Sequence, residues 1–77
     1  MKEFTQPLFA DKSLELRFEN GEVCIYGTEE GFKRLSFFCA QLVNQLKNGT
    51  SEHIHLQDYD ILTPNSLPGV LAVFKCA

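Results

Sequence analysis

Apolar and polar residues alternate along the first clearly patterned segment of the chain. Over 13–18, Leu14, Leu16 and Phe18 alternate with polar residues, which is the period-two pattern of a half-buried strand. The dipeptide at 20–21, Asn-Gly, then predicts a hairpin, because a type I′ turn needs positive φ at both central residues. The return strand over 22–26 is apolar on both faces, so we expect it to lie centrally in a sheet.

A helix is predicted over 29–47. Thr28 is a favourable N-cap, and two glutamates follow it where the helix dipole favours negative charge. Lys47 and the Asn-Gly pair after it are typical of a helix end. Apolar residues at three- and four-residue spacing predict the face that packs on the core. This stripe comprises Phe32, Leu35, Cys39, Leu42 and Leu46, widened by Ser36, Phe38 and Val43.

The second half of the chain predicts two further strands. Residues 52–57 alternate, with Ile54 on one side and His53 and His55 on the other. Residues 58–68 contain two prolines and predict a loop, and the apolar run 70–74 predicts the last strand. The first dozen residues, which include Phe4 and Leu8, are expected to add a short strand or to pack as an extension.

The order strand, strand, helix, strand, strand (ββαββ) predicts a single small α+β domain over 1–77. We expect a single-layer, largely antiparallel four-stranded sheet with the helix packed on one face. One helix cannot cover both faces, so the opposite face is predicted to be open and is our candidate binding surface. Its members are Glu15, Arg17, Tyr26, His53 and His55.

Composition narrows the class of partner and the location. The chain has 7 Lys and Arg against 10 Asp and Glu and a net charge of −3, which disfavours nucleic acid as a partner. The three cysteines are odd in number and lack Cys-x-x-Cys spacing, which predicts reduced thiols and a cytoplasmic location. No apolar run is long enough to cross a membrane, so we expect no membrane partner.

The chain offers no complete catalytic or metal-binding motif. His53 and His55 share one side of a strand, but two imidazoles alone do not make a metal site, and we prefer solvated histidines. Cys39 falls on the apolar helix stripe and is expected in the core, while Cys24 lacks an orienting third group. We therefore expect no enzymatic activity, no catalytic residues and no cofactor.

The loop that begins with Asp58, Tyr59 and Asp60 has two interpretations. Its aromatic ring and carboxylates are suited to anchoring a basic protein surface. Alternatively, Tyr59 folds over the core and the aspartates cap turns, a role that Ser66 would share further along. The predicted partner-binding residues are Tyr26, His53, His55, Asp58, Tyr59 and Asp60.

The phrase His-Ile-His-Leu at 53–56, followed by Leu62-Thr63, Ser66-Leu67 and the apolar last strand, resembles family 32 of the bacterial immunity proteins. The resemblance covers roughly 14–74. It implies a protein that neutralises a cognate toxin domain of a polymorphic toxin system by stoichiometric binding. Two alternatives stay open: a small metal- or ligand-sensing domain built on the two histidines, and a homodimeric adaptor in which two open sheet faces bury one another.

Overall fold

The fold is taken from a computed structural model that describes residues 13–49 and 51–76. Along the chain it comprises β1 (Leu14–Glu19), β2 (Glu22–Gly27), α1 (Glu29–Lys47), β3 (His53–His55), the 3₁₀ turn η1 (Leu56–Asp58) and β4 (Val70–Ala72). The class is α+β and the order of elements is the predicted one. The predictions for Phe4, Leu8 and the rest of the first dozen residues lie outside the described residues.

The first hairpin forms as its sequence predicts. β1 and β2 pair antiparallel from Leu14 opposite Gly27 to Glu19 opposite Glu22. The two turn residues have positive φ, 55° at Asn20 and 79° at Gly21. Asparagine and glycine tolerate this conformation better than other residues, so local chemistry sets the register of the hairpin.

Helix α1 also begins and ends at the predicted residues. The Thr28 side chain accepts a hydrogen bond from the Gly31 backbone N–H at 3.0 Å. Glu29 and Glu30 occupy the first turn, where they complement the helix dipole. After Lys47 the chain leaves the helix through Gly49, whose φ is 86°.

The predicted four-stranded sheet is wrong, because the described strands form two separate two-stranded sheets, β1–β2 and β3–β4. The second edge of β1 is covered by the loop that follows η1. The Leu14 N–H donates to the Ile61 carbonyl at 2.7 Å, and the Leu67 N–H donates to the Leu16 carbonyl at 2.9 Å. Among the described strands, β2 is therefore an edge strand and not a central one. β3 stops at His55 because the chain turns into η1 there.

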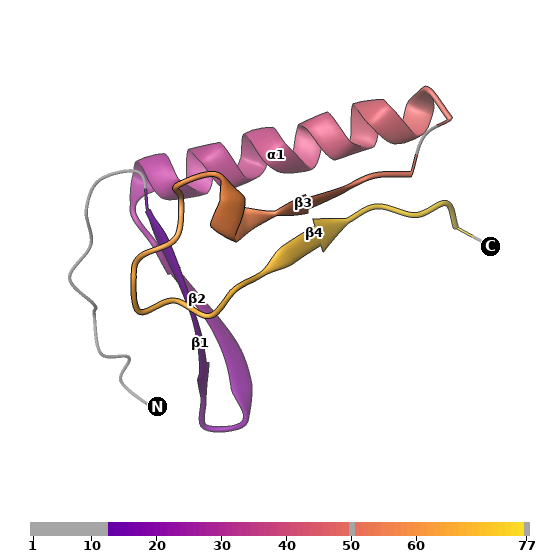
Figure 1. Ribbon diagram of the computed structural model, residues 1–77. Coiled ribbons are helices and arrows are strands. Elements are labelled where there is room, and N and C mark those ends of the chain that lie inside the picture. The colour runs from indigo at the N-terminus through magenta and orange to yellow at the C-terminus, as the bar shows by residue number, and fades with distance from the viewer. Residues whose placement is uncertain (1–12, 50, 77) are drawn as a thin grey trace.

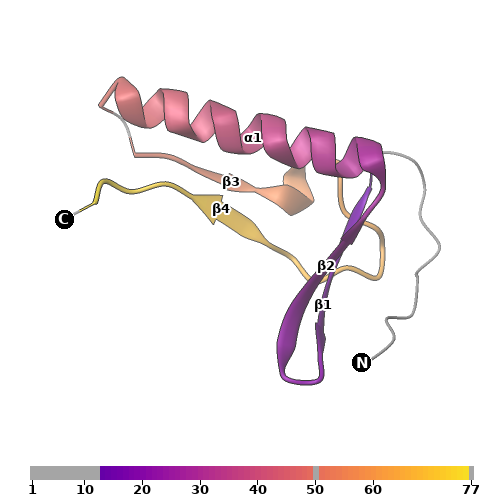
Figure 2. The same cartoon turned by 180° about the vertical axis from the view of Figure 1, so that it is seen from behind.

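The two hairpins diverge beneath the helix (Figure 1). β3 and β4 run along α1, whereas β1 and β2 leave the N-terminal end of α1 and carry their turn away from it. The view from behind in Figure 2 shows the same separation of the hairpin turn from the helix. One part of the first hairpin thus lies within the fold and the other projects from it.

The core lies where α1, β3, the start of β1 and the loop after η1 meet. Its buried apolar residues are Leu14, Phe38, Leu42, Ile54, Leu56 and Ile61. Leu16, Leu35, Leu62, Leu71 and Val73 pack against them while partly exposed. Within the described ranges, no helix is both long and apolar enough to cross a membrane.

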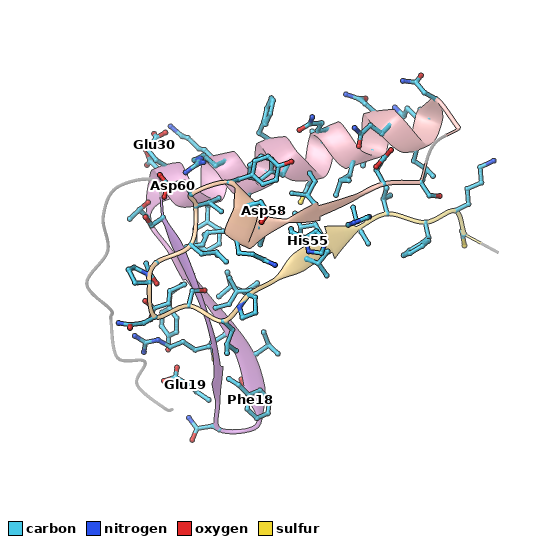
Figure 3. All side chains as sticks on the ribbon, in the orientation of Figure 1. Phe18, Glu19, Glu30, His55, Asp58 and Asp60 are labelled. Carbon is cyan, nitrogen blue, oxygen red and sulfur yellow. The ribbon has the colours of Figure 1, made fainter. Side chains whose placement is uncertain are left out.

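Several predictions about burial are wrong. The exposed members of the predicted helix stripe are Phe32, Ser36, Cys39 and Val43. Cys39 is exposed, because the buried side of α1 follows Gly31, Phe38 and Leu42, and Cys39 lies one position further around the helix than Phe38. Phe18 is 67% exposed although it shares a face with buried Leu14, because it lies near the hairpin turn, away from α1 (Figure 3).

Candidate protein-binding surface

The five residues predicted to share one open face occupy two different sheets. Glu15, Arg17 and Tyr26 belong to the β1–β2 hairpin, whereas His53 and His55 belong to β3. Figure 3 shows the hairpin end, marked by Phe18 and Glu19, well apart from His55, Asp58 and Asp60. The prediction of a common face is therefore wrong, because the two groups belong to separate sheets.

The hairpin residues form a polar network. The Arg17 Nε donates to the Glu15 carboxylate at 2.5 Å, and the guanidinium lies over the Tyr26 ring at 4.9 Å from its centroid. The Tyr26 hydroxyl donates to the Glu19 carboxylate at 2.5 Å, and this bond is the main reason that its pKa is raised to about 12. Glu19 and Arg17 are also paired at 3.5 Å. The network ties the polar side chains of the hairpin to one another.

Glu15 is only 2% exposed, which corrects its placement on an open face. The Thr63 hydroxyl donates to its carboxylate at 2.5 Å. This hydrogen bond, together with Arg17, lowers the pKa of Glu15 against the opposing effect of burial. Sequence reasoning missed the contact because Thr63 is 48 residues away along the chain. A buried carboxylate with both partners in place has a structural role here.

His53 and His55 are exposed on β3, with ring centroids 4.9 Å apart and perpendicular planes. Their cross-strand neighbours are Ala72 and Val70, which offer no ligand atoms. Across the part of the chain that the structure describes, no group of three or more His, Cys, Asp or Glu side chains is placed to hold a metal ion. The pair thus stands as two adjacent imidazoles on an open strand.

The Tyr59 ring is packed against the core on one side and exposed on the other. Its ring packs against Phe38 at a centroid distance of 5.1 Å, yet the residue remains 47% exposed. Arg34 fixes the loop from α1 by donating to the backbone carbonyls of Tyr59, at 2.7 Å, and Asp60, at 3.2 Å. Asp60 has a φ of 54°, so the chain turns sharply there. The ring thus rests on the core and presents its other side to solvent.

Beside Tyr59 lies an exposed aromatic residue that the sequence analysis did not select. Phe37 is 66% exposed and stacks edge-on with Phe38 at 6.2 Å. A shallow pocket of about 420 Å³ is lined by Lys33, Arg34, Phe37, Phe38 and Tyr59. The signal in the sequence is a phenylalanine placed off the core stripe of an amphipathic helix.

We call this region the Tyr59 surface. It joins η1 and the following loop to the N-terminal half of α1, and both aspartates of the loop are exposed at its edge. The residues of the Tyr59 surface are Lys33, Arg34, Phe37, Phe38, Asp58, Tyr59 and Asp60. Of the predicted partner-binding residues, it includes the three from the loop and excludes Tyr26, His53 and His55.

Comparison with known proteins adds no relative: no protein-family model, no curated protein sequence and no solved structure matches this chain.

Proposed function

We propose that the protein is a non-catalytic binding protein that neutralises a cognate bacterial toxin domain through stoichiometric binding. The Tyr59 surface is the observation that carries this proposal. It presents two exposed aromatic residues, Tyr59 and Phe37, beside the carboxylates of Asp58 and Asp60. The resemblance of 14–74 to bacterial immunity proteins supports the choice of a toxin as the partner.

The Tyr59 surface has the attributes of a protein interface. Tyrosine and phenylalanine contribute large contact areas and lose little conformational entropy when they bind. Arg34 and Phe38 already hold Tyr59 in position in the free protein. A preorganised anchor lowers the entropy lost on association, so more of its contact energy appears as affinity.

Charge favours a basic partner. The chain carries a net charge of −3, and Asp58 and Asp60 lie exposed beside the aromatic pair. Lys33, on the same surface, is paired with Glu29 at 3.4 Å and Glu30 at 3.2 Å. Rim carboxylates increase the rate of association with a positively charged protein and disfavour acidic ones. A toxin domain with a basic active-site surface fits these requirements.

Identifying the partner is the first test. The tagged protein, expressed in its source bacterium, is expected to co-purify with a toxin C-terminal domain near one-to-one stoichiometry, as identified by mass spectrometry. Recovery of the bait alone would contradict the proposal. Addition of the purified protein is then expected to abolish the activity of the isolated toxin domain.

The Tyr59 surface is tested by the combined change Tyr59→Ala and Asp58→Asn. We expect affinity for the captured toxin to fall by at least about thirtyfold, because an aromatic anchor contributes about 2 kcal/mol or more. Binding is measured by calorimetry, and circular dichroism verifies that the fold is retained.

Phe74→Ala is the matched control for that variant. Phe74 is also an aromatic residue, is 75% exposed, and lies after β4, outside the Tyr59 surface. It should leave affinity unchanged. Equal affinities for wild type and the Tyr59 variant would remove this surface from the toxin interface.

A second candidate function is that of a metal-sensing domain. The 4.9 Å spacing of the His53 and His55 rings favours it. Zinc titration of the purified protein separates the two functions. Stoichiometric zinc binding that is lost in His53→Ala would support metal sensing, whereas toxin capture that is unaffected by a chelator would support neutralisation.

A further inference from the structure

Among the residues that the structure describes, no strand pairs with the outer edge of β2. In the other strand of the hairpin, β1, the outer edge is covered by the loop after η1. Backbone hydrogen bonds join this loop to Leu14 and Leu16. Within 13–49 and 51–76, β2 pairs with β1 alone. Natural edge strands are usually protected by lysine, proline or a bulge, and β2 has none of these in its sequence or its register.

The backbone of β2 directs specific groups toward this edge. Residues that flank a two-residue turn form a hydrogen-bonded pair, which here is Glu19 with Glu22. Hydrogen-bonded and non-hydrogen-bonded pairs then alternate along an antiparallel ladder. The alternation turns the backbone of Cys24 toward β1 and directs the N–H and C=O groups of Val23 and Ile25 outward.

The side chains beside this edge are apolar and exposed. Val23 is 68% exposed and Ile25 is 50% exposed, and both lie on the same face as Phe18 at the projecting end of the hairpin. Val, Ile, Cys and Tyr make up most of the strand, and branched and aromatic residues favour β pairing. The edge thus combines outward backbone groups with exposed apolar side chains.

We propose that two copies of this chain associate by antiparallel pairing of their β2 strands about a two-fold axis at Cys24. In this register Val23 and the partner subunit's Ile25 form hydrogen-bonded pairs on both sides of the axis. Cys24 faces the partner subunit's Cys24 as a non-hydrogen-bonded pair. The product is a four-stranded sheet with the order β1, β2, β2, β1, in which the two hairpins continue one another.

The sequence of β2 is complementary to itself in this register. This favours a second copy of the chain as the partner that pairs with the outer edge of β2. Val23 meets an isoleucine on the apolar face, and Glu22 meets the partner subunit's Tyr26 on the polar face, so no like charges are opposed. A shift of one residue would bring the apolar face against the polar one. A shift of two residues in sum would bring Val23 against the partner subunit's glycine at position 27, which leaves one apolar pair, Ile25 with the partner subunit's Ile25, in place of two.

The size of the interface predicts a reversible dimer. Pairing over 22–26 buries less than the about 800 Å² per partner that is typical of a stable complex. We therefore expect dimer formation to depend on protein concentration in the micromolar range. This inference goes beyond the proposed toxin binding and does not depend on it.

Cysteine cross-linking tests the register directly. In a non-hydrogen-bonded antiparallel pair the Cα atoms are about 4.5 Å apart, within the about 4.4–6.8 Å range of disulfides. The purified chain is treated with diamide, which takes up the two electrons and two protons that the thiols lose. The Cys39→Ser, Cys76→Ser variant, which retains Cys24, is expected to form a disulfide-linked dimer rapidly.

Two single-cysteine controls separate this register from random collision. One retains only Cys39, which is exposed on α1, and the other carries Ile25→Cys in a background with the three native cysteines changed to serine. Both should cross-link at least about tenfold more slowly. In the proposed register, residue 25 of one copy lies opposite residue 23 of the partner, so two cysteines at position 25 are not adjacent. Cys39 lies on α1, outside the paired strands. Equal rates for the three variants would overturn the proposed register.

Light scattering after gel filtration tests association without any cross-link. We expect the wild-type chain to shift from monomer to dimer between low and high micromolar concentration. Val23→Lys places a charge at the edge and should remain monomeric, whereas the matched change Phe37→Lys on α1 should still dimerise. A wild-type chain that stays monomeric throughout would overturn the proposal.

If the wild-type chain stays monomeric, amide exchange would identify what else covers the outer edge of β2. Slow amide exchange at Val23 in the monomer would show that another segment of the same chain covers the edge. Fast exchange that becomes slow when toxin is added would assign the edge to the toxin. Both results exclude self-pairing, and neither the cross-linking nor the light scattering requires that the toxin be known.

Discussion

At the scale of single residues, the placement of Glu15 shows how a tertiary contact changes the role of a side chain. Its position in β1 alternates with Leu14 and Leu16, which predicts a solvent-facing carboxylate. The carboxylate is instead buried and bonded to Thr63 and Arg17. Burial of a charge is unfavourable unless hydrogen bonds replace water, so the stability of this contact depends on the Thr63 hydroxyl.

Thr63→Val removes that hydroxyl while preserving the shape of the side chain. We expect the free energy of unfolding at neutral pH to fall by about 1.5–3 kcal/mol, the usual contribution of a hydrogen bond to a charged group. Urea denaturation measures the change. Thr63→Ser, which keeps the donor, is the control and should remain much closer to wild type.

The pH dependence of the Thr63→Val effect follows from the lowered pKa of Glu15. Thr63 is the largest cause that lowers this pKa below its ordinary value of 4.5. A carboxyl with a depressed folded-state pKa contributes stability that is fully present above its unfolded value and is lost as pH falls through the folded value. The gap between wild type and Thr63→Val should therefore be widest above pH 4.5 and narrow below it. A gap that does not depend on pH would contradict this role.

At the scale of elements, α1 and β1 approach each other through a glycine. Gly31 is buried in the first turn of the helix. A Cβ at this position would meet the backbone carbonyl of Ser13, whose carbon would be 2.8 Å away. Ser13 is itself fixed, because its carbonyl accepts a hydrogen bond from the Thr28 N–H at 3.2 Å. The contact between helix and strand thus requires a residue without a side chain.

Gly31→Ala has two opposing effects on the stability of the protein, one through helix propensity and one through packing. Alanine is favoured over glycine inside a helix by about 1 kcal/mol, but overpacking against fixed backbone destabilises by about 1–3 kcal/mol. We expect a net loss of stability and a lower melting temperature by calorimetry. Ser36→Ala, at an exposed position of the same helix, should change stability by less than about 0.5 kcal/mol. A melting temperature raised by Gly31→Ala would mean that α1 can shift away from β1.

At the scale of the whole molecule, the loop after η1 connects the two hairpins. Its Ser66 hydroxyl accepts a hydrogen bond from the Leu16 N–H at 2.8 Å and donates to the Leu67 carbonyl at 2.8 Å. The loop is therefore part of the folded framework, and it replaces the strand that a continuous sheet would place beside β1.

Ser66→Ala leaves the Leu16 N–H without its acceptor. We expect the free energy of unfolding to fall by about 1–3 kcal/mol, which is the penalty for an unsatisfied backbone donor. Amide exchange should accelerate at Leu16 and, because the connection between hairpins is weakened, in both hairpins. Asn65→Ala, at an exposed neighbouring position, is the control. Faster exchange in β1 and β2 with no change in β3 and β4 would show that the hairpins unfold independently.

The sequence by itself determined the features that depend on neighbouring residues. Asn20 and Gly21 set the first turn because their own backbone preferences favour positive φ. Thr28 and Gly49 set the limits of α1 because capping is satisfied within one turn of the helix. The resulting order of elements and the α+β class follow from such local signals.

Tertiary structure alone decided how far each apolar face is covered and which strands pair. The alternation in β1 assigns Leu14 and Phe18 to one face, but whether each is buried depends on where α1 ends relative to the hairpin. Likewise, two edges of β1 were available, and the loop containing Ile61 and Thr63 occupied the second one. Contacts between residues this distant in sequence depend on loop closure and shape, which no local pattern encodes.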